Sequence, residues 1–183
     1  MDVDNAADTV KPDNVQASLP GRWKSQGRLT PELELRRKYL AADESKSDSS
    51  LTNISGMVIS TPQFYAAKKW AYRAVLFFTT ASATGGAKFA ISVNDGVTSM
   101  KLQITIYNGS TGAVLASGRI TAQPSSSIGV VTPAGSHYAI IEGTIFAAGS
   151  GPIQARFAQQ VTDGANPVTV QQDSHQTLTQ LDE

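Results

Sequence analysis

The sequence of 183 residues contains no cysteine. Disulfide bridges, thiolate metal ligands and cysteine nucleophiles are therefore excluded, and a durable fold must come from packing or from association between chains. The sequence also lacks an excess of charge of either sign, because 15 basic and 15 acidic side chains give a formal net charge of zero at pH 7. No overall field directs such a protein toward nucleic acid or anionic lipid, so we expect partners to be recognised by shape and predict no nucleic-acid partner.

Long apolar runs are missing as well. No stretch approaches the roughly 18 apolar residues needed to span a bilayer, so we expect no membrane insertion. The first eight residues are acidic and lack the basic and then apolar pattern of a secretory signal, which predicts a mature chain that starts near Met1. With 40% hydrophobic and 16% charged residues, the composition predicts a globular protein with one main domain.

Residues that could carry chemistry are few. The two histidines, His137 and His175, have no second histidine or carboxylate at a metal-ligand spacing. Glycoside hydrolysis needs two carboxylates facing one bond, and of the scattered acidic residues after position 51 only Glu142 lies within an apolar strand pattern, where we expect it to face solvent. The glycine pairs do not precede a helix, and no serine has the context of a nucleophile elbow. The sequence therefore predicts a protein that is not an enzyme and has no metal or cofactor.

Charge is distributed unevenly along the chain. Of the 30 charged side chains, 17 lie within the first 50 residues. Residues 1–29 combine scattered charges with proline and glycine and show no apolar period, so they cannot bury enough surface to offset the entropy of ordering. We interpret this segment as an extended arm.

A short helix is predicted at about residues 31–43. Thr30 is a suitable N-cap, Pro31 suits the first helical position, and Glu32 and Arg36 form a favourable pair four residues apart. The apolar stripe is thin, so this helix would need a partner surface.

The polar run at residues 43–50 has the composition of a flexible linker and marks the expected domain boundary. We therefore divide the chain into an N-terminal arm, residues 1–50, and a knob, residues 51–183.

The knob has the pattern of an all-β protein. Between Met100 and Tyr107 apolar and polar residues alternate with period two, and the turn at Asn108 and Gly109 leads into a second run at residues 114–120, as in a hairpin. About eight such runs occur without helices between them, which predicts an antiparallel, jelly-roll-like β-sandwich. The other runs are residues 70–78, 87–93, 138–146, 153–159, 168–171 and 177–181.

The run from Lys68 to Arg73 combines basic and aromatic side chains, as nucleic-acid sites do. Trp70 and Tyr72 nevertheless share one face of a strand with Leu76 and Phe78, which is the pattern of core residues. We therefore interpret the aromatics as core and the basic residues as protection of an exposed strand.

Four segments of the knob carry a resemblance to a known group of proteins: residues 70–80, the Gly85-Gly86 turn with the strand after it, residues 140–145, and residues 151–160. In this order they resemble the β-sandwich modules of tailed-bacteriophage virion proteins, over about residues 60–181. Such modules are found in capsid decoration or cement proteins, head fibres and tail fibres, and are usually homotrimeric. The resemblance implies a homotrimer, and Val75 and Phe77, opposite the Trp70 face, are the expected contacts between protomers.

Two functions follow from this resemblance. In the first, the protein is a trimeric decoration protein on the outer capsid surface of a virion, and its arm binds the lattice of the major capsid protein. In the alternative, it is a head or tail fibre adhesin that binds host-surface glycan, with Tyr65, Tyr107 and Tyr138 as the stacking residues. An unrelated bacterial surface or matrix protein is a third reading. The expected capsid contacts of the arm are Arg22, Trp23, Arg28, Leu33, Arg36, Arg37, Tyr39 and Leu40.

Overall fold

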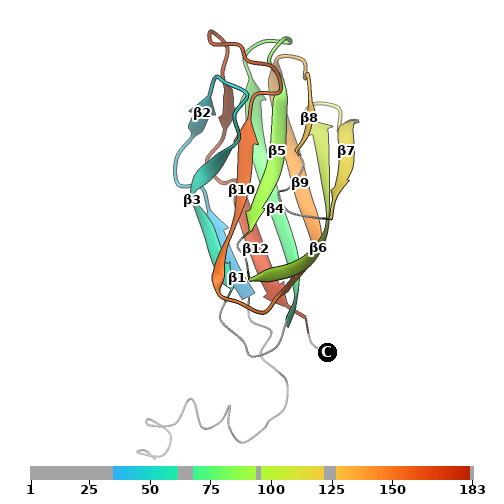
Figure 1. The fold of residues 1–183 in the computed structure, drawn as a ribbon. Helices are drawn as coiled ribbons and strands as arrows, with labels where there is room; N and C mark the ends of the chain where they lie inside the picture. The colour runs from blue at the N-terminus through green and yellow to red at the C-terminus, as the bar shows by residue number, and fades with distance from the viewer. Residues whose placement is uncertain (1–34, 62–67, 94–95, 122–126, 182–183) are drawn as a thin grey trace, which may run out of the picture. The chain divides into compact units, whose positions relative to one another are not determined.

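A computed structural model describes residues 35–61, 68–93, 96–121 and 127–181, and their regular structure consists of twelve strands (Figure 1). The described residues form no helix, so none long and apolar enough to cross a bilayer occurs among them. The strands are β1 (Leu35–Tyr39), β2 (Glu44–Lys46), β3 (Thr52–Thr61), β4 (Lys68–Thr80), β5 (Ala87–Val93), β6 (Val97–Asn108), β7 (Val114–Ile120), β8 (Ile128–Val130), β9 (Gly135–Ala147), β10 (Gly151–Ala158), β11 (Val168–Val170) and β12 (His175–Gln180).

The strands form two sheets. The larger has eight strands in the order β1-β12-β4-β9-β6-β7, with β11 pairing β4 and β2 pairing β11, and the smaller has four strands in the order β3-β10-β5-β8. Every pairing is antiparallel. The two sheets lie face to face (Figure 1), which confirms the all-β antiparallel sandwich predicted from the sequence.

The core lies between the sheets and is built by strict alternation. Along β4, every second residue from Trp70 to Thr80 is buried, and the buried Phe78 packs against Phe89 of the smaller sheet with ring centroids 5.0 Å apart. Trp70 and Tyr72 are both buried, as predicted for core residues.

A buried polar contact also joins the two sheets. The Tyr72 hydroxyl donates to the Gln176 side-chain oxygen at 2.7 Å, and the Gln176 amide nitrogen donates to the carbonyls of Met57 and, at 3.3 Å, Ile153. Burial raises the pKa of Tyr72 above its ordinary value, so this hydroxyl remains a donor. Because each buried group has a partner, the contact fixes the relative register of the sheets at little cost in desolvation.

The helix predicted at residues 31–43 is wrong over its described part. Residues 35–39 form β1, which pairs antiparallel with β12, and Leu40 follows with its amide donating to the Ser174 carbonyl at 2.8 Å. Leu40 is only 5% exposed and belongs to the core. The capping and pair interactions that favoured a helix are worth a few tenths of a kcal/mol each, so pairing with β12 and burial of Leu40 outweigh them. Residues 31–34 lie outside the described part of the chain.

The linker predicted at residues 43–50 is also wrong, because this segment is held by the sandwich. Strand β2 pairs with β11, and the Asp43 carboxylate accepts from the backbone N–H of Gln172 at 2.7 Å. Further along, the backbone N–H of Gln159 donates to the backbone carbonyl of Asp48 at 3.0 Å.

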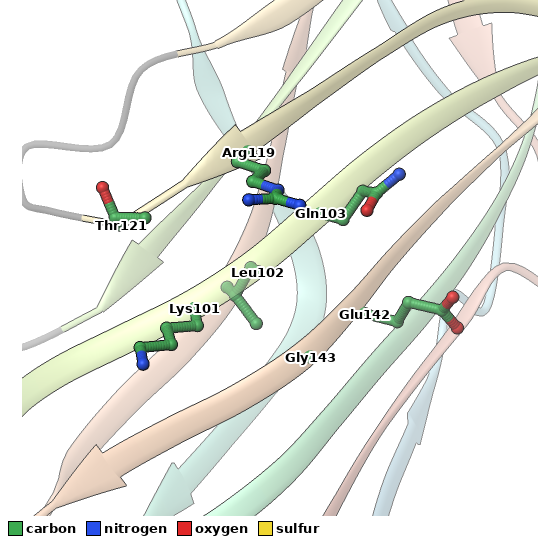
Figure 2. A pocket seen from close by; sticks show the side chains of 7 residues that line it. All are labelled: Lys101, Leu102, Gln103, Arg119, Thr121, Glu142 and Gly143. Carbon is green, nitrogen blue, oxygen red and sulfur yellow. The ribbon is translucent and has the colours of Figure 1, made fainter.

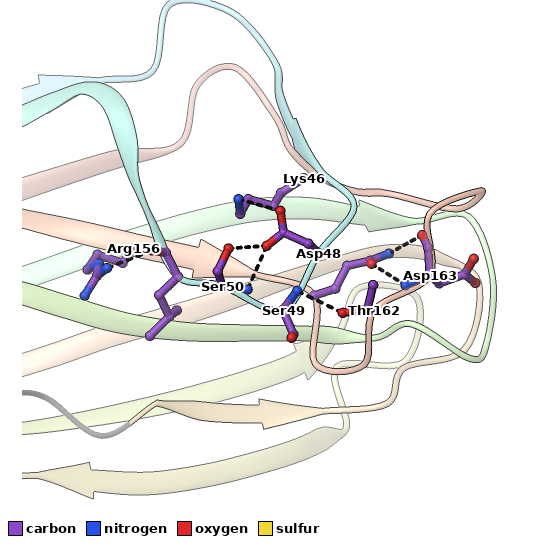
Figure 3. Close-up of polar contacts among 9 residues, drawn as sticks. Lys46, Asp48, Ser49, Ser50, Arg156, Thr162 and Asp163 are labelled. Atoms are coloured by element: carbon purple, nitrogen blue, oxygen red, sulfur yellow. Dashed lines mark hydrogen bonds and ion pairs between the residues drawn. The ribbon is translucent and has the colours of Figure 1, made fainter.

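The Asp48 side chain organises the turn before β3 (Figure 3). Its carboxylate accepts from the hydroxyl and the amide of Ser50 and from Lys46 Nζ at 2.9 Å, while the Ser49 amide donates to the Thr162 hydroxyl at 3.2 Å. The Ser50 hydroxyl, followed by Lys46, lowers the pKa of Asp48 from 3.8 to about 2. The expected boundary at residue 50 is therefore wrong, and the chain divides between Glu32 and Leu33 instead.

Candidate binding face of the larger sheet

The candidate site lies on the outer face of the eight-stranded sheet, the side turned away from the core. Because side chains alternate along a strand, β4 and β9 each present a second set of residues on this face. Val75 and Phe77 belong to it, as the sequence predicted, and Phe77 is 39% exposed.

Three aromatic residues form a row across neighbouring strands at one end of this face. Phe77 of β4 lies opposite Tyr138 of β9, which lies opposite Tyr107 of β6; we call these three residues the aromatic row. The rings of Tyr107 and Tyr138 are stacked, with centroids 4.7 Å apart and an interplanar angle of 12°. Two separate predictions, the protomer contacts and the glycan tyrosines, thus fall on one surface. Tyr65 lies outside the described residues.

The next row of residues is mostly aromatic or aliphatic from β1 to β9 and ends in a polar residue on β6. Tyr39, His175, Val75 and Ile140 follow one another across β1, β12, β4 and β9, and the rings of Tyr39 and His175 are 5.6 Å apart. On β6 this row continues with Thr105. The apolar surface of the face therefore extends from the aromatic row toward the β1 edge.

A row of charged and polar residues crosses the same face two residues further along. Arg73 and Glu142 stand near its middle, with 3.7 Å between Arg73 Nε and a Glu142 carboxylate oxygen and 60% exposure of both side chains. An exposed pair of this kind contributes at most about 1 kcal/mol. In register order the row is Arg37, Thr177, Arg73, Glu142, Gln103 and Arg119.

A shallow groove of about 480 Å³ opens at the β9, β6 and β7 side of this row (Figure 2). Lys101, Gln103 and Arg119 line it together with Glu142, and Leu102, Thr121 and Gly143 complete the lining. Lys101 and Arg119 form no ion pair with any described residue. The groove therefore has two cations and one carboxylate in its lining, and it lies on the same face as the aromatic row, further along β6.

The opposite end of the aromatic row has acidic neighbours. A hollow of about 550 Å³ beside Phe77 is lined by Asp43 and Asp173, together with Ala42, Gln171 and Gln172. This acidic hollow lies at the β4 end of the aromatic row, whereas the charged row that includes Arg37 and Arg73 crosses the whole face.

The structure describes four of the eight predicted capsid contacts, and these four differ in burial. Arg22, Trp23, Arg28 and Leu33 lie outside the described residues. Leu40 is a core residue and cannot contact a capsid, which corrects that prediction because its side chain is covered by the sandwich. The other three described contacts belong to β1: Arg36 Nη1 donates to the Ser60 carbonyl of the smaller sheet, whereas Arg37 and Tyr39 are exposed and 3.0 Å apart from Nη1 to the phenol oxygen.

Within the described ranges, no three His, Cys, Asp or Glu side chains gather in a way that could hold a metal ion. His137 is buried in β9, where Nε2 donates to the Pro133 carbonyl at 2.8 Å. His175 lies in the apolar row described above.

The sequence matches no protein-family model and no curated protein. Similar solved structures include a CocE/NonD family hydrolase from Staphylococcus aureus, at 7% identity and a TM-score of 0.32, covering 82% of this chain and 37% of that chain. They also include infectious bursal disease virus, Gx strain, at 8% identity and a TM-score of 0.25, covering 82% of this chain and 40% of that chain. A VP2 subviral particle of infectious bursal disease virus is similar at 12% identity and a TM-score of 0.22, covering 82% of this chain and 41% of that chain. The chain thus spans less than half the length of these neighbours, and likenesses this weak carry no conclusion about function.

Proposed function

We propose that this chain is a non-enzymatic structural protein of a tailed-phage virion, a decoration protein that binds the outer capsid surface through residues 1–34 and displays the sandwich beginning at β1. The observation that supports it is the position of the segments that resemble phage virion modules. Residues 70–80 and 140–145 lie on the paired strands β4 and β9, and residues 151–160 begin with β10, which pairs with the strand after Gly85-Gly86. The resemblance therefore concerns one packed unit rather than scattered turns.

The surroundings of Glu142 support a role without catalysis. This residue was the strongest carboxylate candidate for glycosidase chemistry, which requires a second carboxylate across the scissile bond. Its described neighbours on the face are Arg73 and Gln103, to which it lies directly opposite, and it is open to solvent. A carboxylate in this position has the ordinary environment of a surface strand.

The shortened leading segment retains four of the expected capsid contacts, Arg22, Trp23, Arg28 and Leu33. Trp and Arg side chains are frequent energetic centres of protein interfaces. We include the homotrimer in the proposal, with Val75 and Phe77 as the contacts between protomers, because Phe77 is exposed and Val75 partly exposed on a central strand.

Deleting residues 1–34 should remove capsid binding and leave a folded sandwich. We expect full-length protein to saturate purified capsids at one stoichiometry in co-sedimentation, and the truncated protein to lose at least about tenfold in affinity, because the anchoring aromatic and arginine side chains are gone. Full-length Trp23→Ala should lose part of this affinity, and Lys88→Gln, on the smaller sheet, should lose none. Equal decoration by the truncated and the full-length protein would contradict the proposal.

A second candidate function is that of a fibre adhesin that binds host-surface glycan. The stacked pair of Tyr107 and Tyr138 favours it, because aromatic rings at a surface offer apolar area for the CH groups of a sugar ring. Copy number separates the two functions, since hundreds of copies per particle fit a lattice and a handful fit a fibre.

A further inference from the structure

We propose that the part of the outer face formed by β9, β6 and β7 binds an acidic oligosaccharide. The sugar rings lie along β6, with one ring against Tyr107 and Tyr138 and the acidic groups at Lys101 and Arg119. This inference rests on the adhesin candidate for its carbohydrate and adds the charge of the ligand and its path. It does not depend on how the protein is attached to a particle.

The outward residues of β6 change character in one direction along the strand. They are Tyr107, Thr105, Gln103 and Lys101, an aromatic ring followed by a hydroxyl, an amide and a cation. Since a strand rises about 3.3 Å per residue, Tyr107 and Lys101 are about 20 Å apart. A small ligand cannot reach both, whereas an extended chain of sugar units can.

The polar residues between these ends are held in place by one another. The Gln103 amide nitrogen donates to the Ser117 hydroxyl of β7 at 3.0 Å, and the hydroxyls of Ser117 and Thr105 are 3.2 Å apart. A site whose polar groups are already ordered loses less side-chain entropy when a ligand binds. The phenol hydroxyls of Tyr107 and Tyr138 form no hydrogen bond with described residues, so they are available to sugar hydroxyls.

Charge identifies the ligand as an anion. The protein as a whole is neutral, yet Lys101 and Arg119 line the groove without an ion pair to described residues, and the one carboxylate there, Glu142, lies next to Arg73. Complementary potential favours an acidic partner and its rapid association.

The aromatic geometry favours a sugar over a nucleic acid. Single-stranded nucleic acids stack successive bases on separate ring faces. Here each tyrosine covers one face of the other at 4.7 Å, so the pair does not provide that series of platforms. Apolar ring area, with phenol hydroxyls beside it that bond no described residue, suits the CH and OH groups of a pyranose.

The test uses full-length protein and four probes: a uronic-acid oligosaccharide of six units, its neutral carboxyl-reduced counterpart, a single-stranded oligonucleotide of equal charge, and dextran sulfate. Affinities are measured by titration calorimetry at two salt concentrations. We expect binding of the uronic-acid chain that weakens with salt. The double variant Lys101→Gln with Arg119→Gln should bind at least about tenfold more weakly and lose most of the salt dependence, and Tyr107→Ala should bind at least about tenfold more weakly with the salt dependence retained. Lys88→Gln serves as the matched control and should bind as the parent does.

The outcomes separate the two proposals. Equal binding of the acidic and the neutral chain would overturn the acidic specificity and leave the adhesin function standing. No binding of either chain would overturn both the acidic specificity and the adhesin function. Tighter binding of the oligonucleotide would overturn the inference in favour of a nucleic-acid surface. Binding of dextran sulfate that is insensitive to Tyr107→Ala, without binding of the uronic-acid chain, would reduce the site to general charge attraction and also overturn it.

Discussion

Deleting residues 1–50 will abolish folding of the sandwich, although deletion of residues 1–34 will not. The longer deletion removes β1 and β2 and exposes the edge of β12, and it also removes Leu40 from the core. Loss of a buried leucine alone costs about 2–5 kcal/mol, and the lost strand pairing adds to this. The free energy of unfolding of a domain is only about 5–15 kcal/mol. Urea unfolding of the 1–50 deletion should therefore show no cooperative native baseline.

Point variants of full-length protein distinguish the loss of these contacts from a general effect of truncation. Leu40→Ala should lower the free energy of unfolding by about 2–5 kcal/mol. Tyr39→Ala, at a residue that is 52% exposed, should lower it by less than about 1 kcal/mol. A 1–50 deletion that unfolds at the same urea concentration as the parent would show that residues 35–50 are dispensable, contrary to their place in the sheet.

The second large effect is expected at Gly143, in the middle of β9. Its φ angle is +145°, and a Cβ built there would lie 2.1 Å from the Lys101 carbonyl oxygen of β6. Gly143→Ala therefore combines a strained backbone with a collision against a strand that cannot move without breaking its ladder. We expect a loss of at least about 3 kcal/mol in the free energy of unfolding, measured by urea titration.

Gly112 is the matched control for this substitution. It also has a positive φ angle, +70°, but a Cβ there would meet nothing within 4 Å. Gly112→Ala should therefore cost only the backbone term, about 1–2 kcal/mol. Equal losses for the two variants would mean that the close approach of β6 to β9 is not what requires glycine at position 143.

The central strands could be predicted from the sequence because burial of every second side chain produces an alternation of apolar and polar residues. Trp70, Tyr72, Leu76 and Phe78 are buried at every second position of β4, as the pattern indicated. Strand β1 (LRRKY) could not be predicted, because Arg36 follows Glu32 by four residues, as in a helix, and because the strand pairs with one far along the chain: Leu35 lies opposite Thr179, 144 positions later. Only tertiary pairing decides between the two structures there.

The residues of the binding face could be found one by one, but their arrangement could not. Period-two alternation placed Val75 and Phe77 outside, and Tyr107 and Tyr138 were selected as aromatic candidates. Their meeting depends on the register of β4, β9 and β6, which local sequence does not specify. The basic groove was missed for the same reason, since Arg119 reaches it only through the pairing of β7 with β6.

Electron cryomicroscopy of capsids carrying the full-length protein tests the division of roles most directly. We expect each sandwich to be joined to the shell only through density that precedes β1, with Tyr107, Lys101 and Arg119 facing solvent. A reconstruction in which β6 and β7 pack on the shell, or in which residues 1–34 make no contact with it, would contradict the account.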